Sequence, residues 1–77
     1  IEERYPAFYM HTHNGKRINE TEYQVCLLVK AGFTPSDIDI LLGRNEYAAT
    51  TRKRLLKKIF NQEGSGKDFD KMIQELA

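Results

Sequence analysis

The sequence predicts an all-α fold: a compact bundle of four main helices that contains a helix-turn-helix and follows a short N-terminal helix. Three observations lead to this expectation. Apolar residues recur at helical spacing in successive segments. Capping residues and glycines bound those segments, and a chain of 77 residues can enclose only one hydrophobic core. We expect residues 1–17 to form a lead-in and residues 18–77 to form the helix-turn-helix domain.

The lead-in is expected to consist of a short helix and a loop. The helix begins at Pro6, because proline is well tolerated in a first turn, and its aromatic residues lie over the core. Asn14-Gly15 is a strong turn signal. The residues between His11 and Arg17 are therefore predicted to form an exposed loop.

The first main helix is predicted from about Asn19 to Ala31. Asn19 is a favourable N-cap, and Glu20 and Glu22 lie in the first turn, where the helix dipole favours acids. Gly32 provides the stop. Its core-facing stripe is Tyr23 or Val25, followed by Leu27, Leu28 and Ala31.

The second main helix is predicted to be only about eight residues long. Thr34 can accept a hydrogen bond from the amide near Asp37, and Pro35 occupies the first turn. Gly43 ends the helix. The predicted inward stripe is Ile38, Leu41 and Leu42.

A third helix follows after Arg44, with or without Asn45, and continues through Phe60. Because the connection is so short, the two helices must cross steeply. The predicted inward residues are Ala48, Arg52, Leu55 and Ile59, with Leu56 and Phe60 beside them. Arg52 is expected to pack its stem and extend its charged head to solvent. The opposite, solvated face carries Thr50, Lys53, Arg54 and Lys57.

A final helix is predicted after the break at Gly64-Ser65-Gly66. Ser65 and Asp68 have the spacing of a helix start. The apolar stripe is Phe69, Met72, Ile73 and Leu76. This stripe is expected to pack on this chain or on a second copy of it.

The net charge of +1 is distributed unevenly along the chain. Residues 1–43 contain four basic and six acidic groups, residues 44–58 contain six and one, and residues 59–77 contain two and four. The positive charge therefore lies in one segment of fifteen residues. A basic stripe on an otherwise acidic body is typical of proteins that bind a polyanion.

The combination of a short capped helix, a tight turn and a longer basic helix predicts binding of double-stranded DNA, because an α-helix fits the major groove. The predicted base contacts are Glu46, Tyr47, Thr50, Thr51 and Arg54. The predicted phosphate contacts are Lys53, Lys57 and Lys58, together with Thr34 and Ser36 at a helix N-terminus. Arg44 completes the predicted DNA-binding set. A purely solvated charged face is the alternative interpretation of the lysines.

Other kinds of site find little support in the residues. Cys26 is the only cysteine and is expected to be a buried, inert thiol, as suits a reducing cytoplasm. His11 and His13 have no cysteine or third histidine to complete a metal site. Gly64-Ser65-Gly66 lacks the pattern of a phosphate loop, and no Ser, His and Asp arrangement is suggested. We expect no cofactor, no metal and no enzymatic activity. No apolar run reaches the roughly 20 residues that span a bilayer, and no signal peptide is recognised, so we expect no membrane contact.

Two blocks of sequence resemble the LuxR/NarL-type helix-turn-helix domains of bacterial transcription regulators. Residues 18–25, Ile-Asn-Glu-Thr-Glu-Tyr-Gln-Val, are similar to that family's Leu-Thr-x-Arg-Glu-x-Glu-Val. Residues 32–38, Gly-Phe-Thr-Pro-Ser-Asp-Ile, are similar to the start of its Gly-Leu-Ser-x-x-Glu-Ile-Ala, at the same spacing. Leu41-Leu42 and residues 52–60 also resemble its closing part.

The resemblance implies a four-helix DNA-binding output module with a sensory or repeat region upstream in the parent chain. It also implies a homodimer through the last helix, with Phe69, Met72, Ile73 and Leu76 as the dimerisation residues. Asp39 replaces the small residue that the family prefers against the turn, and Ala48 or Ala49 replaces its usual valine. The leucines after Arg54 can be aligned with the family in two registers one residue apart, so the register of the recognition helix stays open by one residue.

Two alternative functions remain open. The promoter-binding domain of a sigma factor shares the same motif, and affinity for core RNA polymerase would distinguish it. A helical protein-interaction module that has lost DNA binding is the other alternative. Glu46 and the Ala48-Ala49 pair favour it, because an acid repels phosphates and small side chains read little.

Overall fold

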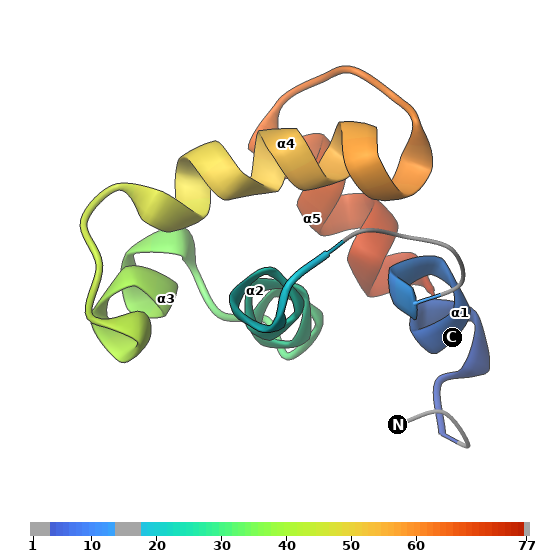
Figure 1. Cartoon of the computed structure of the whole chain (residues 1–77), viewed down its shortest axis with the longest axis horizontal. Helices are drawn as coiled ribbons and strands as arrows, with labels where there is room; N and C mark the ends of the chain where they lie inside the picture. Colours follow the sequence, from blue (N-terminus) through green and yellow to red (C-terminus); the bar gives the residue numbers. More distant parts are fainter. Residues whose placement is uncertain (1–3, 14–17, 77) are drawn as a thin grey trace.

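The structure, a computed structural model, describes residues 4–13 and 18–76, with His11 described by its backbone only. Over these residues it contains helices and no strand, which confirms the predicted all-α fold (Figure 1). The helices are α1 (Pro6–His13), α2 (Glu20–Lys30), α3 (Pro35–Leu42), α4 (Tyr47–Phe60) and α5 (Gly66–Glu75). None of them is both long enough and apolar enough to cross a membrane.

Helix α1 begins at Pro6, as predicted, but it extends further than expected. Residues 11–13 are helical and not part of a loop, while residues 14–17 lie outside the described residues. The reason is the anchoring of the last turn: the Thr12 hydroxyl is buried and donates to the carbonyl of Phe8 at 3.0 Å. The His13 ring also stacks on Tyr9, with ring centroids 4.1 Å apart.

Helix α2 begins with a reciprocal pair of hydrogen bonds. The Asn19 side chain accepts from the backbone amide of Glu22 at 2.8 Å, and the Glu22 carboxylate accepts from the backbone amide of Asn19 at 2.9 Å. This capping box satisfies two backbone donors that the first turn would otherwise leave unpaired. The predicted N-cap is therefore confirmed, and Gly32, with φ at +94°, follows the helix end.

Helix α3 has the predicted caps but a narrower inward face. Thr34 accepts from the amide of Asp37 at 3.2 Å, and Gly43 ends the helix in the left-handed conformation with φ at +66°. Ile38 is buried, whereas Leu41 is 58% exposed, so its predicted core position is wrong. Because so short a helix contacts the body along one edge, only residues a full turn apart face inward.

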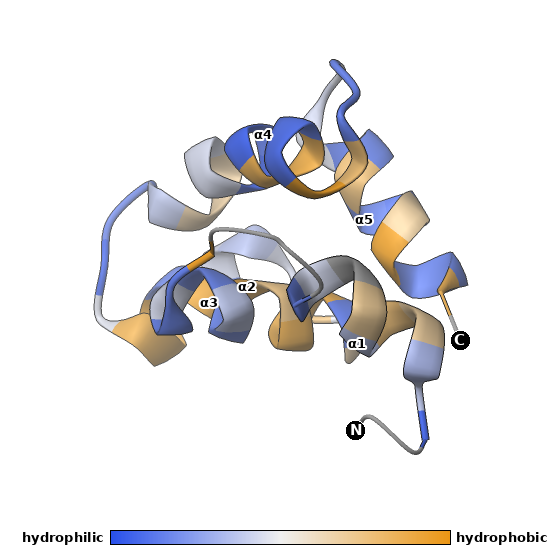
Figure 2. Cartoon of the chain, turned by 45° about the vertical axis from the view of Figure 1, so that its right-hand side comes forward, coloured by the Kyte–Doolittle hydropathy of each residue, from blue (hydrophilic) through white to orange (hydrophobic). Residues whose placement is uncertain are grey.

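Helix α4 crosses above α2 and α3 and packs against α5 (Figure 1). Its lower side is hydrophobic and its upper side is hydrophilic (Figure 2). The buried core that it covers consists of Phe8, Val25, Cys26, Val29, Ile38, Ala48, Leu55, Leu56, Ile59, Phe69 and Ile73. The described residues therefore form one core, and α4 covers one side of it.

Helix α5 packs its apolar stripe on this chain. Ser65 caps it and accepts from the amide of Asp68, as predicted. Phe69 and Ile73 are fully buried in the core of the same chain, so they are not available as dimerisation residues, which corrects that expectation. Met72 and Leu76 are partly buried against the same core.

Candidate nucleic-acid interface

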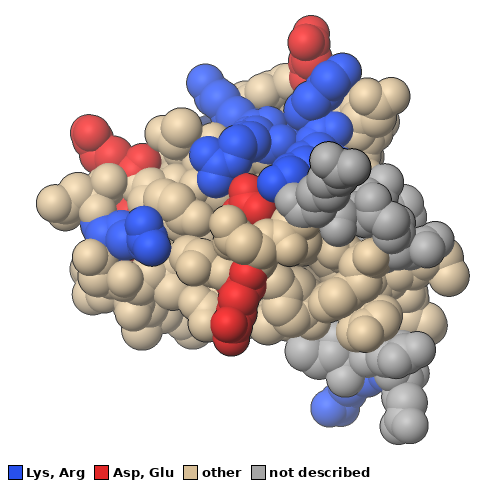
Figure 3. All heavy atoms as spheres, viewed as in Figure 1, with Lys and Arg blue, Asp and Glu red and all other residues tan. Residues whose placement is uncertain are grey.

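The exposed side of α4 carries the basic residues that were predicted to face outward. Thr50, Lys53, Arg54 and Lys57 are all exposed. Figure 3 shows lysine and arginine side chains gathered over α4, in the same orientation as Figure 1. We call Thr50, Lys53, Arg54 and Lys57 the outer face of α4. It presents positive charge on a rigid helix, which is the geometry that a polyanion requires.

The N-terminus of α4 is held by a residue of the preceding helix. Glu46, the residue before the helix, has φ at +54° and makes no side-chain cap. The Asp39 carboxylate of α3 instead accepts from the amide of Ala48 at 2.8 Å. A carboxylate at a helix N-terminus both satisfies a free donor and complements the dipole. Asp39 thus connects the two helices of the helix-turn-helix directly.

Helix α4 begins at Tyr47, one or two residues later than the start predicted after Arg44 or Asn45. Glu46 is exposed and precedes α4, so it does not lie on that helix. Ala48 is buried and Ala49 is exposed, so Ala48 occupies the inward position of the pair.

The structure contradicts the prediction that Thr51 contacts DNA. Its side chain is 0% exposed and points into the bundle, because it lies 100° around the helix from Thr50. Its hydroxyl has no hydrogen-bond partner among the described residues. Thr51 is therefore a core residue and cannot touch a base.

Arg44 and Tyr47 form a stacked pair in the turn before α4. The Arg44 guanidinium carbon lies 4.6 Å from the centroid of the Tyr47 ring. Tyr47 is half-buried against the core, while Arg44 is exposed. The ring thus supports the guanidinium from one face, and a cation–π contact of this kind restricts its motion.

Arg54 and Lys58 share one buried carboxylate. The Glu22 side chain is 3% exposed, and its oxygens accept from Arg54 Nε at 3.2 Å and from Lys58 Nζ at 3.1 Å. Burial raises the pKa of Glu22, but the hydrogen bonds from the Asn19 amide, Lys58 and Arg54 outweigh burial and leave the pKa below its ordinary value. Arg54 and Lys58 are therefore fixed to the body of the domain at one edge.

Thr34 and Ser36 lie at the N-terminus of α3 and not on α4. Both are exposed. The Thr34 hydroxyl accepts from the amide of Asp37, whose own acid lies in the first turn. A phosphate at this helix end would meet that carboxylate, so these two residues are the weaker part of the predicted set.

Arg52 is oriented inward, as predicted, but its head is paired and does not reach solvent. It is 9% exposed and forms an ion pair with Asp70 of α5. Burial raises the pKa of Asp70, and the neighbouring Arg52 opposes that rise. Gly66 lies directly against this guanidinium, since a Cβ at that position would be 2.6 Å from its carbon. Arg52 fastens α4 to α5 and takes no part in the outer face.

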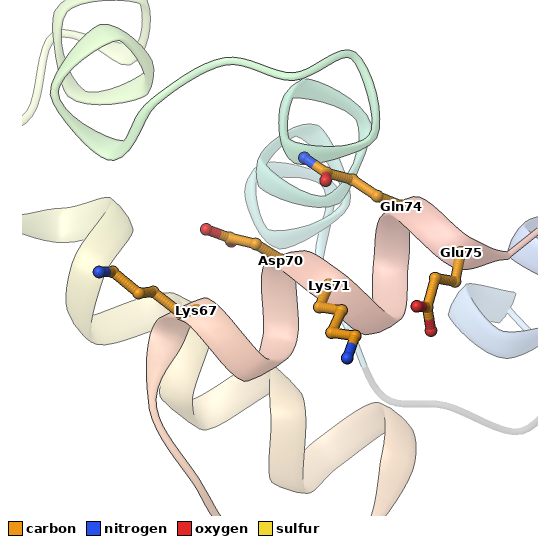
Figure 4. A pocket seen from close by; sticks show the side chains of 5 residues that line it. All are labelled: Lys67, Asp70, Lys71, Gln74 and Glu75. Atoms are coloured by element: carbon orange, nitrogen blue, oxygen red, sulfur yellow. The ribbon is translucent and has the colours of Figure 1, made fainter.

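Cys26 is buried, and burial raises the pKa of its thiol to about 12, so it is an inert thiol as predicted. Over the described residues, no group of three or more His, Cys, Asp or Glu could hold a metal ion. A hollow of about 440 Å³ lies along α5 and is lined by Lys67, Asp70, Lys71, Gln74 and Glu75 (Figure 4). Its lining includes two lysines and two carboxylates, so the hollow has no excess of positive or negative charge that would favour one kind of ion.

Comparison of the chain with family models, curated proteins and solved structures finds no match. Three acidic residues that contact α4 were missed as partners in the sequence: Glu22, Asp39 and Asp70. The spacing of Asn19 and Glu22 is a capping-box signal that was available. The contacts of Asp39 and Asp70 join different helices, and no local sequence pattern predicts them.

Proposed function

We propose that this domain binds double-stranded DNA through the outer face of α4, as the output domain of a bacterial transcription regulator. The observation that carries the proposal is the exposed basic face on a helix that follows a short capped helix and a tight turn. Such a helix fits the major groove while its neighbour braces it from behind. The resemblance to LuxR/NarL-type domains supports the same function.

The proposed DNA contacts are of two kinds, contacts to phosphates and contacts to base edges. Lys53 and Lys57 are exposed and have no carboxylate partner among the described residues, so they are suited to phosphates. Thr50 and Tyr47 lie near the start of α4, where base edges are met in helix-turn-helix proteins. Arg54 is half exposed and held at Nε by Glu22, so only the far edge of its guanidinium is offered to DNA.

Fluorescence anisotropy with a labelled mixed-sequence duplex tests the proposal. Affinity should fall as salt rises, with a slope of about −0.9 per phosphate contact on a logarithmic scale. The double variant Lys53→Ala, Lys57→Ala should weaken binding and flatten the slope by about two. Lys67→Ala, Lys71→Ala removes the same charge from α5 and is the matched control. An affinity that does not depend on salt, or equal losses in both variants, would contradict DNA binding by α4.

A second candidate function is protein docking through α3. Ile40 and Leu41 are 77% and 58% exposed on the outer side of that helix, an unusual position for two large aliphatic residues. Ile40→Ser, Leu41→Ser should leave DNA affinity unchanged if α4 binds DNA as proposed. A pull-down in which the wild-type chain recovers protein and no DNA would favour the docking function.

A further inference from the structure

Two arginines flank the first turns of α4, and the structure holds them differently. Arg54 donates its Nε to a carboxylate that is almost completely buried. If Arg54 turned away to hydrogen-bond a base with both edges, Glu22 would keep only Lys58 and the Asn19 amide as partners. That loss is unfavourable because a buried carboxylate depends on its hydrogen bonds. Arg54 is thus better suited to positioning than to reading sequence.

Arg44 is held without using any of its N–H donors on a carboxylate. Over the described part of the chain it has no ion-pair partner. Its backbone is fixed, because its amide donates to the carbonyl of Asp39 at 2.9 Å just after the left-handed Gly43. Its guanidinium lies over the Tyr47 ring, which the core supports from below. Its guanidinium carbon lies 4.6 Å from the ring centroid, and among the described residues no hydrogen bond or ion pair takes up its edge of donors.

That free edge has the chemistry of guanine recognition. Two parallel N–H donors of arginine match the O6 and N7 acceptors that guanine presents in the major groove, and this is the commonest specific contact between proteins and DNA. A side chain that is already ordered loses less conformational entropy when it binds. We propose, on the basis of the DNA-binding function above, that Arg44 stacked on Tyr47 is the guanine-reading residue of this domain and that Arg54 only positions α4.

The proposal is tested in two steps on the full chain. Selection from a random duplex library first gives the preferred sequence, and each guanine in it is then replaced singly by 7-deazaguanine, which lacks the N7 acceptor. For wild type, one position should lose roughly 10- to 100-fold in affinity. In Arg44→Lys that loss should shrink to about twofold, because an ammonium group cannot make the planar pair. Tyr47→Leu should reduce the loss in the same direction, and Arg54→Lys should retain it in full.

Three results would overturn the inference. If Arg44→Lys and Arg44→Ala weaken all duplexes equally, flatten the salt slope and keep the 7-deazaguanine effect, Arg44 contacts a phosphate and reads no base, while the DNA-binding function stands. If the effect disappears in Arg54→Lys, the two arginines have the opposite roles. If wild type binds no duplex in a salt-dependent way, the DNA-binding function itself fails. Circular dichroism of each variant confirms that the fold is retained.

Discussion

Thr50 and Thr51 are neighbours in sequence that lie in opposite environments. Thr50 is exposed, and its hydroxyl donates to the carbonyl of Glu46 at 3.2 Å. Thr51 is completely buried, and its hydroxyl has no partner among the described residues. Within one turn of α4, Thr50 is therefore available to a binding partner, and Thr51 serves the packing of the core.

Thr51→Val should raise the free energy of unfolding by about 1 kcal/mol, because it removes a buried hydroxyl without a partner and nearly preserves the shape of the side chain. Its DNA affinity should remain within twofold of wild type. Thr50→Val, the same change on the outer face, should weaken DNA binding severalfold with little effect on stability. Urea unfolding and anisotropy measure the two quantities. A loss of DNA affinity in Thr51→Val alone would contradict the buried position.

Glu22 is a buried carboxylate whose ionisation contributes to the stability of the fold. Its pKa in the folded protein lies below its ordinary value of 4.5. The stability that the ionised carboxylate contributes is therefore complete above pH 4.5 and is lost as the pH falls through the lowered folded pKa. Acid should therefore weaken the connection between α2 and α4 as Glu22 becomes protonated.

Glu22→Gln should lower the free energy of unfolding at pH 7 by about 1–2 kcal/mol, because Arg54 and Lys58 lose their charged acceptor. The difference from wild type should narrow as the pH falls below the ordinary pKa of glutamate. Urea unfolding from pH 7 downward measures it, with Glu20→Gln as the exposed control in the same turn. A difference that stays constant down to the lowest pH would exclude the ion pairs as its cause.

At the scale of the elements, the α3–α4 connection depends on one cross-helix hydrogen bond. Asp39 accepts from the amide of Ala48, and Glu46 provides no cap of its own. The position of Tyr47 and Thr50 relative to α3 therefore depends on a residue one helix earlier. In the sequence, Asp39 stood out only because the LuxR/NarL-type pattern has a small residue at that position. In the structure, its carboxylate caps the N-terminus of α4.

Asp39→Ala should cost about 1 kcal/mol of stability, as the loss of an N-cap does. It should also weaken DNA binding, since the first turn of α4 frays where base edges are met. Asp39→Asn retains an acceptor and should lose only a few tenths of a kcal/mol. Thermal unfolding gives the stabilities, and hydrogen exchange at the Ala48 amide reports the cap directly. Equal exchange rates at that amide in wild type and Asp39→Ala would rule the cap out.

Local signals in the sequence were sufficient for most of the elements. Asn19, Thr34 and Ser65 each begin a helix as predicted, because a capping side chain bonds to its own first turn. The start of α4 was misplaced because Glu46 adopts a left-handed conformation that its residue type does not indicate. Leu41 was wrongly predicted to be buried, because the spacing of apolar residues shows which side of a helix faces the core but not how much of that side is covered.

At the scale of the whole molecule, a partly buried ion pair between Arg52 and Asp70 joins α4 to α5. Gly66 lies against this pair, since a Cβ at that position would be 2.6 Å from the guanidinium carbon and the guanidinium would have to shift to admit it. The sequence placed Arg52 on the inward side correctly, but its partner is eighteen residues away on another helix. Which surface of α5 meets α4 is thus a tertiary property that spacing alone did not reveal.

Gly66→Ala should destabilise the protein by about 1–3 kcal/mol, although alanine is the better helix former, because the added methyl displaces a paired, buried arginine. In the background Arg52→Met, Asp70→Asn the same change should cost almost nothing. Chemical unfolding of the four proteins gives the coupling energy in a double-mutant cycle. Equal costs in both backgrounds would show that Gly66 is needed for another reason.

The central claim is that the outer face of α4 and the turn before it receive the DNA. Amide chemical-shift changes on titration of the ¹⁵N-labelled chain with duplex DNA test it most directly, since they report both whether and where binding occurs. We expect the largest changes from Arg44 to Lys57, with the outward residues leading and α5 little affected. Changes concentrated on α5 or α1, or no change at DNA concentrations that saturate the anisotropy signal, would contradict the claim.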